Sequence, residues 1–450
     1  MNYPRAFLFS AALLAFAGLP ACGGDDGTTG DEQDVTQGPK LRFDEYQVLF
    51  TNPVCKLYPY GPDQDVVSES GEKLTAKPEN VFCTSADSPA SAARPESPQN
   101  KLITWIKDPS VKEIFFTYLS FSNSAVTKEL CSAITDRDVK VTFVIDESSD
   151  TVKADQIMAC KPKSGDPARA PRFEKRGHEG GIGYAHNKIF MVNPGESTMK
   201  IAFSSGNMSS GVVLHHENWH FITLPSDTYF AQAHLCAMQG ELDHHSSKSE
   251  YKSWITSCRA AITQQEERDI KVFFAPAEGA KASKVLTEAV AKAKSIDVAA
   301  HRFGYTTLVN ALASRLSGSN PPAIRFVGDD DIWWAGKGEV VGDNQSFEWW
   351  NVKKLTDRGA QARWMETNHG GHLLHHNKYL ILNMPKGTPS AVFGGAGNLT
   401  GTAFNENWEN FYYITIPAVV ESFRKQYDHV WNDLATDPAD MPAQNVLPPG

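Results

Sequence analysis

Two segments of the sequence carry the same set of residues that could do chemistry. Each begins with a histidine and has a lysine two positions later: His186 and Lys188 in the first segment, His376 and Lys378 in the second. An apolar run follows in both, which is typical of a buried β-strand. Because residues two apart on a strand project from the same face, each histidine and its lysine point to the same side. Imidazoles transfer protons or attack electrophiles near neutral pH, and ammonium groups bind anions, so the pattern indicates chemistry at an anionic group.

An asparagine and a glutamate follow each segment at matched distances. Asn207 and Asn398 end small-residue loops 21 and 22 residues after their histidines, and Glu217 and Glu406 follow 31 and 30 residues after them. A single His-x-Lys arises about once by chance in a chain of this composition. Two copies with the same residues downstream indicate a duplicated unit.

The combined residues suit the cleavage of a phosphodiester. If the two halves pack about a pseudo-twofold axis, two histidines, two lysines and two asparagines converge on one cleft. The lysines and asparagines would bind the non-bridging oxygens and stabilise the charge of a pentacovalent transition state. One imidazole would attack phosphorus while the other protonates the leaving oxygen, and a carboxylate of Glu217 or Glu406 would fix the tautomer of each ring. Water would then hydrolyse the phosphohistidine, and this chemistry requires neither a metal nor a cofactor.

These motifs resemble the signature of the phospholipase D superfamily, which is a duplicated His-x-Lys-x4-Asp followed by Gly-Ser-x-Asn. The resemblance extends from about residue 44 to residue 435, and the members include phospholipases, nucleases and phosphatidyltransferases. It implies phosphodiester hydrolysis or transfer through a covalent phosphohistidine, with His186 as the nucleophile and His376 as the acid. This sequence has Asn193 and Asn383 at the position of the aspartate, a difference that bears on substrate class more than on catalysis.

The remaining pattern predicts the elements that must hold these residues. Apolar, β-branched runs alternate with helical periodicity in the same order in both halves, which is typical of α/β folds. The predicted fold class is α/β, with two pseudo-symmetric phospholipase D-like halves, each a mixed sheet flanked by helices, and one active site at their interface. The first half spans residues 41–265 with an insertion at about 54–100, the second spans 266–436, and a loose tail follows at 437–450.

The first residues are typical of an export signal. Arg5 precedes a short apolar run that ends at Cys22, and a polar stretch rich in Gly, Thr and Asp follows. The pattern resembles a bacterial lipoprotein signal over residues 1–22, with Cys22 lipidated and a flexible linker at 23–40. We therefore expect a protein of the bacterial cell envelope, held in the outer membrane or periplasm by a lipid anchor. A plain secretory signal, which would give a secreted protein, is the alternative.

Cysteine usage agrees with export. Apart from Cys22, six cysteines fall in three close pairs along the chain, and the even number indicates disulfides formed in an oxidising compartment. Of the possible connectivities we expect the one that joins these neighbours. The expected pairs are Cys55 with Cys83, Cys131 with Cys160, and Cys236 with Cys258.

Three further clusters resemble sites. Residues 215–220 contain three histidines and Glu217 but lack the His-Glu-x-x-His spacing of zinc sites, so we expect them to support the active site rather than bind metal. The three aspartates at 329–331 are expected to form an acidic turn after a strand. The tryptophan pairs at 333–334 and 349–350 fit either a lip that faces lipid or ordinary packing.

The charge balance bears on the substrate. The 450 residues include 43 Lys and Arg against 53 Asp and Glu, and the resulting net charge of −10 would repel polyanionic nucleic acid at long range. With 41% hydrophobic and 21% charged residues, the composition is that of a globular protein and excludes disorder throughout the chain. We therefore favour a phospholipid substrate, with an extracytoplasmic nuclease as the alternative and a non-catalytic surface-binding protein as a distant third.

Overall fold

The computed structural model describes residues 38–54, 56–59, 66–67, 73–74, 79–82, 85–338, 346–367 and 373–441. The expected lipoprotein signal with Cys22, and the expected pairing of Cys55 with Cys83, lie outside these residues. From Gly38 onward the described residues belong to one compact unit. Within them, no helix is both long enough and apolar enough to cross a bilayer.

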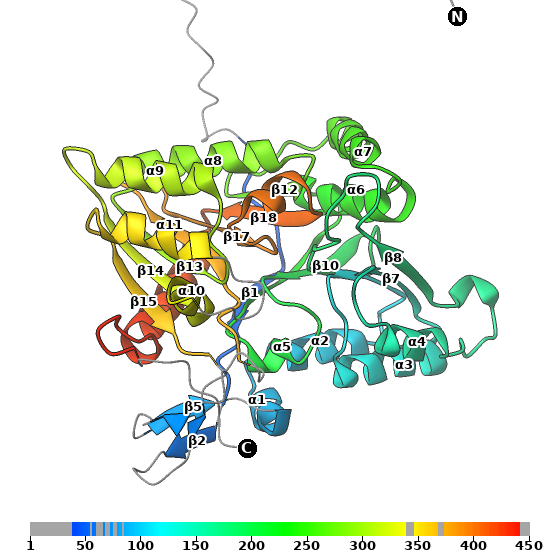
Figure 1. Cartoon of the computed structure of the whole chain (residues 1–450). Coiled ribbons are helices and arrows are strands. Elements are labelled where there is room, and N and C mark those ends of the chain that lie inside the picture. Colours follow the sequence, from blue (N-terminus) through cyan, green and yellow to red (C-terminus); the bar gives the residue numbers. More distant parts are fainter. Residues whose placement is uncertain are drawn as a thin grey trace, which may run out of the picture. The chain divides into compact units, whose positions relative to one another are not determined.

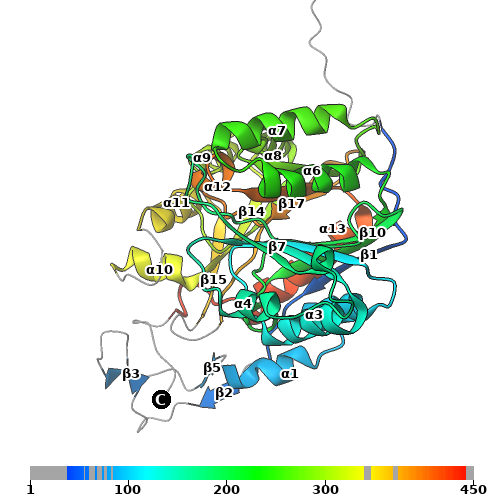
Figure 2. The same cartoon turned by 90° about the vertical axis from the view of Figure 1, so that its right-hand side faces the viewer.

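Seven strands of the first half form a mixed sheet in the order β1-β11-β10-β9-β6-β7-β8. Strands β6, β7 and β8 run parallel, and the other neighbours pair antiparallel. Helices α2, α3 and α4 cover one face of this sheet, and α6 and α7 cover the other (Figures 1 and 2). The strands are β1 (Glu45–Phe50), β6 (Glu113–Tyr118), β7 (Lys140–Asp146), β8 (Arg172–Arg176), β9 (Ile189–Val192), β10 (Thr198–Ser204) and β11 (Asn218–Pro225). The helices are α2 (Pro98–Lys107), α3 (Ser124–Arg137), α4 (Val152–Met158), α5 (Gly211–Leu214), α6 (Tyr229–Asp243) and α7 (Lys248–Ala261).

The insertion expected between β1 and α2 contains small elements of its own. Two two-stranded sheets pair β2 with β5 and β3 with β4, and the short helix α1 follows. Their bounds are β2 (Lys56–Pro59), β3 (Val66–Val67), β4 (Lys73–Leu74), β5 (Glu79–Phe82) and α1 (Ser88–Ala92).

The second half repeats the arrangement of the first. Its strand order, β12-β18-β17-β16-β13-β14-β15, corresponds strand for strand to the first sheet, and helices α8, α9 and α11 pack on it around a core of their own. The strands are β12 (Ile270–Ala275), β13 (Ser295–Ala300), β14 (Ala323–Asp329), β15 (Gln361–Met365), β16 (Lys378–Asn383), β17 (Ala391–Gly395) and β18 (Glu409–Ile414). The helices are α8 (Gly279–Lys292), α9 (Thr306–Leu316), α10 (Asp330–Gly336), α11 (Ser346–Thr356), α12 (Gly401–Asn405), α13 (Pro417–His429) and the π-helix η3 (Val430–Leu434). The predicted α/β class with two mixed-sheet halves is confirmed.

Burial on both faces explains the composition of the central strands. All four residues of β9 are buried, as are five of the six residues of β16. Continuous apolar runs of this kind are what a sheet covered by helices on both faces requires. Because β9 and β16 are the middle strands of their sheets, both His-x-Lys segments enter their sheets at the centre.

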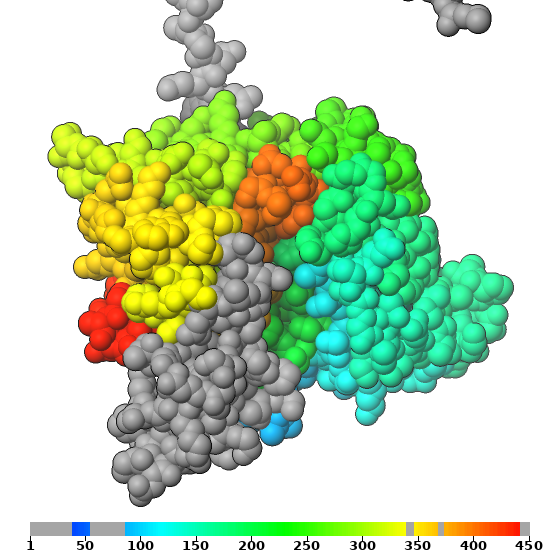
Figure 3. All heavy atoms as spheres, viewed as in Figure 1, coloured from blue at the N-terminus to red at the C-terminus, as the bar shows by residue number. Residues whose placement is uncertain are grey.

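The two halves share a core at their junction. Apolar residues of both form one buried cluster, in which the rings of Phe203 and Tyr412 stack with centroids 3.7 Å apart. Backbone hydrogen bonds also cross the junction, and His186 N donates to Trp408 O at 3.0 Å. Figure 3 shows the orange segment that contains α12 and β18 lying directly against the green first half. The junction therefore fixes each motif segment against the opposite half.

Two of the expected disulfides are present. Cys131 bonds to Cys160, and Cys236 bonds to Cys258, so the predicted pairing is confirmed for these four cysteines. Both bonds lie in the first half, where the second one joins α6 to α7.

Candidate active site

The four motif residues lie at the starts of the two central strands. Lys188 directly precedes β9 and Lys378 begins β16, and both lysines are 0% exposed. His186 and His376 are 7% and 6% exposed, so the rings are almost as deeply buried as the lysines.

An asparagine of the opposite half holds each segment in place. Lys188 N donates to Asn410 Oδ1 at 2.8 Å, and Asn218 Nδ2 donates to Asn377 Oδ1 at 2.9 Å. These contacts are buried, and breaking either would leave an unpaired polar group in the interior. The segments therefore cannot separate without disrupting both halves.

A carboxylate from the opposite half contacts each histidine. His186 Nδ1 lies 2.6 Å from Glu409 Oε2, and His376 Nδ1 lies 3.2 Å from Glu217 Oε1. Because a carboxylate only accepts hydrogen bonds, each ring carries a proton on Nδ1. In the neutral ring, Nε2 then presents its lone pair, which is the arrangement that a nucleophile or a general base requires.

The expected glutamate of the second half, Glu406, is wrong. The side chain of Glu406 is exposed, and Glu409 contacts the ring in its place. The backbone shows the true correspondence: the carbonyls of Asn218 and Asn410 each accept a 3.0 Å hydrogen bond from the loop after β10 or β17. Glu217, which precedes Asn218, is therefore matched by Glu409.

A signal for the right choice is present in the sequence. The pattern Glu-Asn-aromatic occurs twice in succession, at residues 406–408 and 409–411. Only the second copy runs directly into an apolar strand, β18, as Glu217 runs directly into β11. Spacing from the histidine alone favoured the first copy, because the second half has two extra residues before its carboxylate.

The lysine side chains lie beside the rings. Lys188 Nζ is 3.1 Å from His186 Nε2. Lys378 Nζ donates to His376 O of its own half at 2.7 Å, and across the junction to Ser205 O at 3.2 Å. Burial lowers the pKa of Lys188 to about 8, although nearby carboxylates oppose the shift. Burial, and then the charge of Lys188, hold the pKa of Lys378 well below its usual range. The two ammonium groups therefore repel each other in one buried space, and an anion between them would relieve the repulsion.

Both imidazoles are held neutral by their surroundings. Burial lowers the pKa of His186, with Glu409 opposing this effect and Lys188 adding to it. Burial and the charge of Lys378 hold the pKa of His376 well below its usual range. The charge of Lys378 also lowers the pKa of His186, and the charge of Lys188 lowers that of His376, so each lysine acts on the histidine of the other motif.

Each of the two loop asparagines follows a glycine that packs tightly against the opposing segment of its own half. Asn207 follows Gly206. A Cβ atom at position 206 would lie only 1.7 Å from Glu217 Oε2, so only glycine lets the loop come this close to the carboxylate. Asn398 follows Gly397, whose position likewise leaves no room for a Cβ against β18. The Oδ1 atoms of both asparagines are buried and have no hydrogen-bond partner among the described residues. The acceptor atom of each amide is therefore left without a partner in the described part of the chain.

The histidine-rich segment after α5 divides between two places. His215 lies beside the site, with Nδ1 3.2 Å from Glu217 Oε1, the same oxygen that contacts His376. His220 lies in the core, with Nδ1 3.0 Å from the hydroxyl of Tyr46. Of these two histidines, only His215 is therefore positioned to support the site.

Two groups of described residues have the donor atoms to hold a metal ion. One is His215, Glu217 and His376, whose donors lie within 4.8 Å of one another, and the other is the run of aspartates at 329–331. In the second group Asp329 caps the start of α10 by accepting from Asp331 N at 3.1 Å. This contact gives the aspartates a structural role at the end of β14.

Two aspartates at strand ends were not expected to take part in the site. Asp146, at the end of β7, accepts from Ala185 N at 2.7 Å, and Asp329, at the end of β14, accepts from His375 N at 2.7 Å. Each thus fixes the backbone just before a motif histidine. Both strands visibly end in an acid in the sequence, but only the fold shows that β7 and β14 lead to the motif segments.

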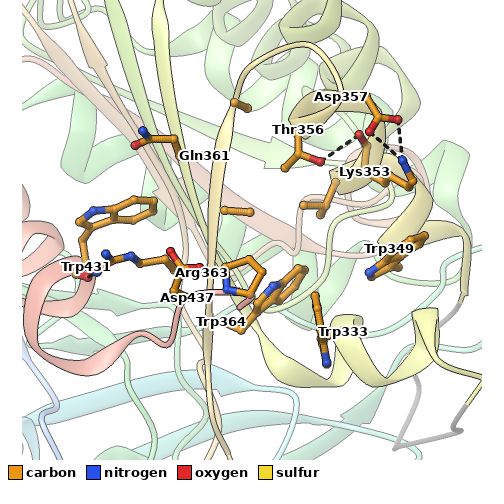
Figure 4. Close-up of a pocket in the computed structure, with 14 residues that line it drawn as sticks. Trp333, Trp349, Lys353, Thr356, Asp357, Gln361, Arg363, Trp364, Trp431 and Asp437 are labelled. Carbon is orange, nitrogen blue, oxygen red and sulfur yellow. Dashed lines mark hydrogen bonds and ion pairs between the residues drawn. The ribbon is translucent and has the colours of Figure 1, made fainter. Parts of the chain in front are cut away.

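The tryptophan pairs do not form a common lip. Trp333 and Trp349 line a cavity of about 550 Å³ at the edge strand β15, and Figure 4 shows them beside Trp364. Trp334 is buried and Trp350 is 59% exposed. The cavity lies three strands away from β16 in the sheet order, and none of the predicted catalytic residues lines it.

The chain is similar to a known family and to solved structures. The family model described as cardiolipin synthase, PLD-like domain, matches residues 286–431. The crystal structure of phosphatidylserine synthase from Haemophilus influenzae Rd KW20 has a TM-score of 0.53 and 12% identity, covering 75% of this chain and 85% of that chain. Yeast tyrosyl-DNA phosphodiesterase gives a TM-score of 0.44 and 12% identity, covering 70% of this chain and 86% of that one. Nuc from Salmonella typhimurium gives a TM-score of 0.29 and 21% identity, covering 37% of this chain and 96% of that chain. A search of curated protein sequences gives no match.

A buried carboxyl behind the first motif makes stability depend on pH. Glu241 on α6 is 0% exposed and accepts from Asn187 Nδ2 at 2.7 Å, and burial raises its pKa from 4.5 to about 7. Because the folded pKa exceeds the unfolded one, this group destabilises the fold progressively as the pH rises from 4.5 to about 7. We expect Glu241→Gln to raise the free energy of unfolding by about 1 to 3 kcal/mol at pH 8 and to change it little near pH 4. Urea unfolding at both pH values tests this, and an equal effect at both would contradict it.

Proposed function

We propose that this chain is a member of the phospholipase D superfamily, an exported phosphodiesterase that cleaves a phospholipid through a phosphohistidine intermediate. The observation that carries this proposal is the pair of crossed contacts, His186 with Glu409 and His376 with Glu217. They orient two buried imidazoles, and we infer that these share one site with the two motif lysines and the amides of Asn207 and Asn398. This set has a nucleophile, a proton donor and the positive charge that phosphoryl transfer requires.

In the first step His186 acts as the nucleophile. Its Nε2 attacks phosphorus and forms an N–P bond, while the P–O bond to the leaving alcohol breaks. Glu409, at 2.6 Å from Nδ1, stabilises the positive charge that develops on the ring. Lys188 and Lys378 bind the non-bridging oxygens, and the amides of Asn207 and Asn398 add hydrogen bonds to them.

His376 supplies the proton that the leaving oxygen takes up. The negative charge of a bound phosphodiester raises the pKa of this imidazole, which burial and nearby cations hold low in the free protein. After the alcohol has left, His376 accepts a proton from water as the water attacks phosphorus. The N–P bond then breaks, which releases the phosphomonoester and restores both rings.

Exposed aromatic side chains around the motifs favour a lipid substrate. Tyr184, two residues before His186, is 47% exposed, and Phe347 at the start of α11 is 50% exposed. Phe347 packs over Gly304, which donates a backbone hydrogen bond to Leu399 beside Asn398. Aromatic side chains in such positions suit the interface of a bilayer better than an aqueous polyanion.

Cations near the same segments are paired with carboxylates. Arg302, next to His301 at the end of β13, lies 2.8 Å from Glu348, and Arg176 at the end of β8 lies 2.9 Å from Glu174. Such pairs supply little net charge to attract a nucleic acid, in line with the overall charge of −10. The similarity of residues 286–431 to the cardiolipin synthase, PLD-like domain also supports a phospholipid.

We further propose that the protein works in the bacterial cell envelope, anchored through a lipidated Cys22. The support is the sequence pattern before Cys22 and the polar stretch behind it. The two disulfides of the first half agree with an oxidising compartment. An anchor of this kind would hold the active site close to its lipid substrate.

The substrate is tested with the purified mature chain. We expect it to convert vesicles of phosphatidylethanolamine and phosphatidylglycerol to phosphatidic acid, and to leave single-stranded DNA intact. His186→Asn should lower the rate by about 10³-fold or more, because it removes the nucleophile. Lipid products are measured by mass spectrometry. Cleavage of DNA without cleavage of lipid would establish the nuclease alternative instead.

The corrected glutamate gives a second test with a matched control. Glu409→Gln removes the charge that orients His186, and we expect kcat for a chromogenic phosphodiester to fall by about 10²-fold or more. Glu406→Gln, three residues away on the surface, should leave kcat within about twofold of the parent, because its side chain is exposed. Equal losses in the two variants would contradict the assignment of Glu409.

A further inference from the structure

One carboxylate oxygen of the site is shared by two imidazoles. His215 Nδ1 and His376 Nδ1 each lie 3.2 Å from Glu217 Oε1, and the two rings have centroids 5.5 Å apart. Glu217 Oε2 accepts from Trp219 Nε1 at 3.1 Å, which fixes the carboxylate against rotation. The three donor atoms therefore converge on one small space.

We propose that His215, Glu217 and His376 form an inhibitory binding site for Zn²⁺ or for a transition-metal ion that prefers the same ligands. Two imidazole nitrogens and one carboxylate oxygen are a ligand set that suits zinc and leaves one position open. A tetrahedral zinc ion with bonds of about 2.0 to 2.1 Å holds its ligand atoms about 3.3 Å apart. The 3.2 Å separations from Glu217 Oε1 already match that spacing. Mg²⁺ and Ca²⁺ prefer more oxygen ligands and do not suit this set.

The surroundings of Glu409, which corresponds to Glu217, show that orienting a motif histidine does not require a second imidazole. There Glu409 Oε2 contacts His186, but its other oxygen accepts from the amide of Asn407 at 3.0 Å. An amide nitrogen is not a metal ligand, whereas His215 at the matching carboxylate is one. A site that only needed to orient its ring could use an amide in both halves.

A third imidazole lies next to the cluster. The ring of His301 lies with its centroid 4.8 Å from that of His376. Its Nδ1 is buried and has no hydrogen-bond partner in the part of the chain that the structure describes. Buried polar atoms normally find a partner, so this nitrogen independently indicates a ligand at this place. His301 is not among the donors that lie within 4.8 Å of one another, so it would complete the coordination through a bound water.

Metal at this site would stop catalysis, and this consequence rests on the proposed function. A neutral imidazole that binds metal through Nδ1 keeps its only proton on Nε2. Nε2 then has no lone pair with which to accept a proton from water. It also cannot release that proton as readily as an imidazolium ion, so His376 would fail as both acid and base.

Binding is tested by calorimetric titration of ZnCl₂ into the chelator-treated mature chain without a histidine tag. We expect one site per chain, with binding weakened at least about tenfold in His215→Ala and no comparable site for MgCl₂. His245→Ala is the matched control, because its Nδ1 also lies 3.2 Å from a glutamate, Glu179, at the surface. Equal zinc affinity in His215→Ala and the parent, with both folded by circular dichroism, would overturn the proposal. So would the absence of zinc binding to the parent.

Turnover measurements separate the metal site from the proposed function. With a chromogenic phosphodiester we expect full activity in EDTA, loss of activity in Zn²⁺, and recovery when EDTA is added back. The residual activity of His215→Ala should resist the same zinc concentration. Zinc binding without any turnover in EDTA would uphold the metal site and count against the proposed function. Turnover that zinc does not affect would overturn the inhibitory role and leave the proposed function intact.

Discussion

The exchange of carboxylates between the two halves is the contact on which the site depends. Each histidine takes its orientation from a glutamate of the opposite half, at 2.6 Å for His186 and 3.2 Å for His376. Neither half could present a correctly protonated ring alone, because its own glutamate points to the other ring. The duplicated fold thus builds one site that exists only when both halves are packed together.

The shared core makes this exchange possible. Burial of both faces of β9 and β16 brings the motif segments to the junction, where water is excluded. Exclusion of water strengthens the contacts between imidazole and carboxylate, but it also raises the free-energy cost of keeping two buried ammonium groups charged. The lowered pKa values of Lys188 and Lys378 express that cost, which a bound phosphate would offset.

Much of this arrangement could be predicted from the sequence, because it depends on local pattern. Apolar runs at strand period, the repeated His-x-Lys spacing and the close cysteine pairs determine the fold class, the central strands and two disulfides. The glutamate of the second half was missed because two successive Glu-Asn-aromatic patterns have nearly equal spacing from His376, and only strand register separates Glu406 from Glu409.

Contacts across the junction could not be predicted from local sequence patterns. The sequence does not show that Glu217 serves His376 rather than His186, because that pairing depends on how two sheets pack. For the same reason the sequence indicated only a histidine-rich segment near 215–220. The structure divides it, placing His215 beside the site and His220 in the core.

The central claim is that the two halves share one covalent reaction centre, with His186 as the nucleophile. Rapid quenching of the reaction at alkaline pH, followed by mass spectrometry of peptides, tests it most directly, because phosphohistidine survives under those conditions. We expect a phosphoryl adduct on His186 that accumulates when the acid and base function of His376 is removed. An adduct on His376, or the absence of any adduct during turnover, would contradict it.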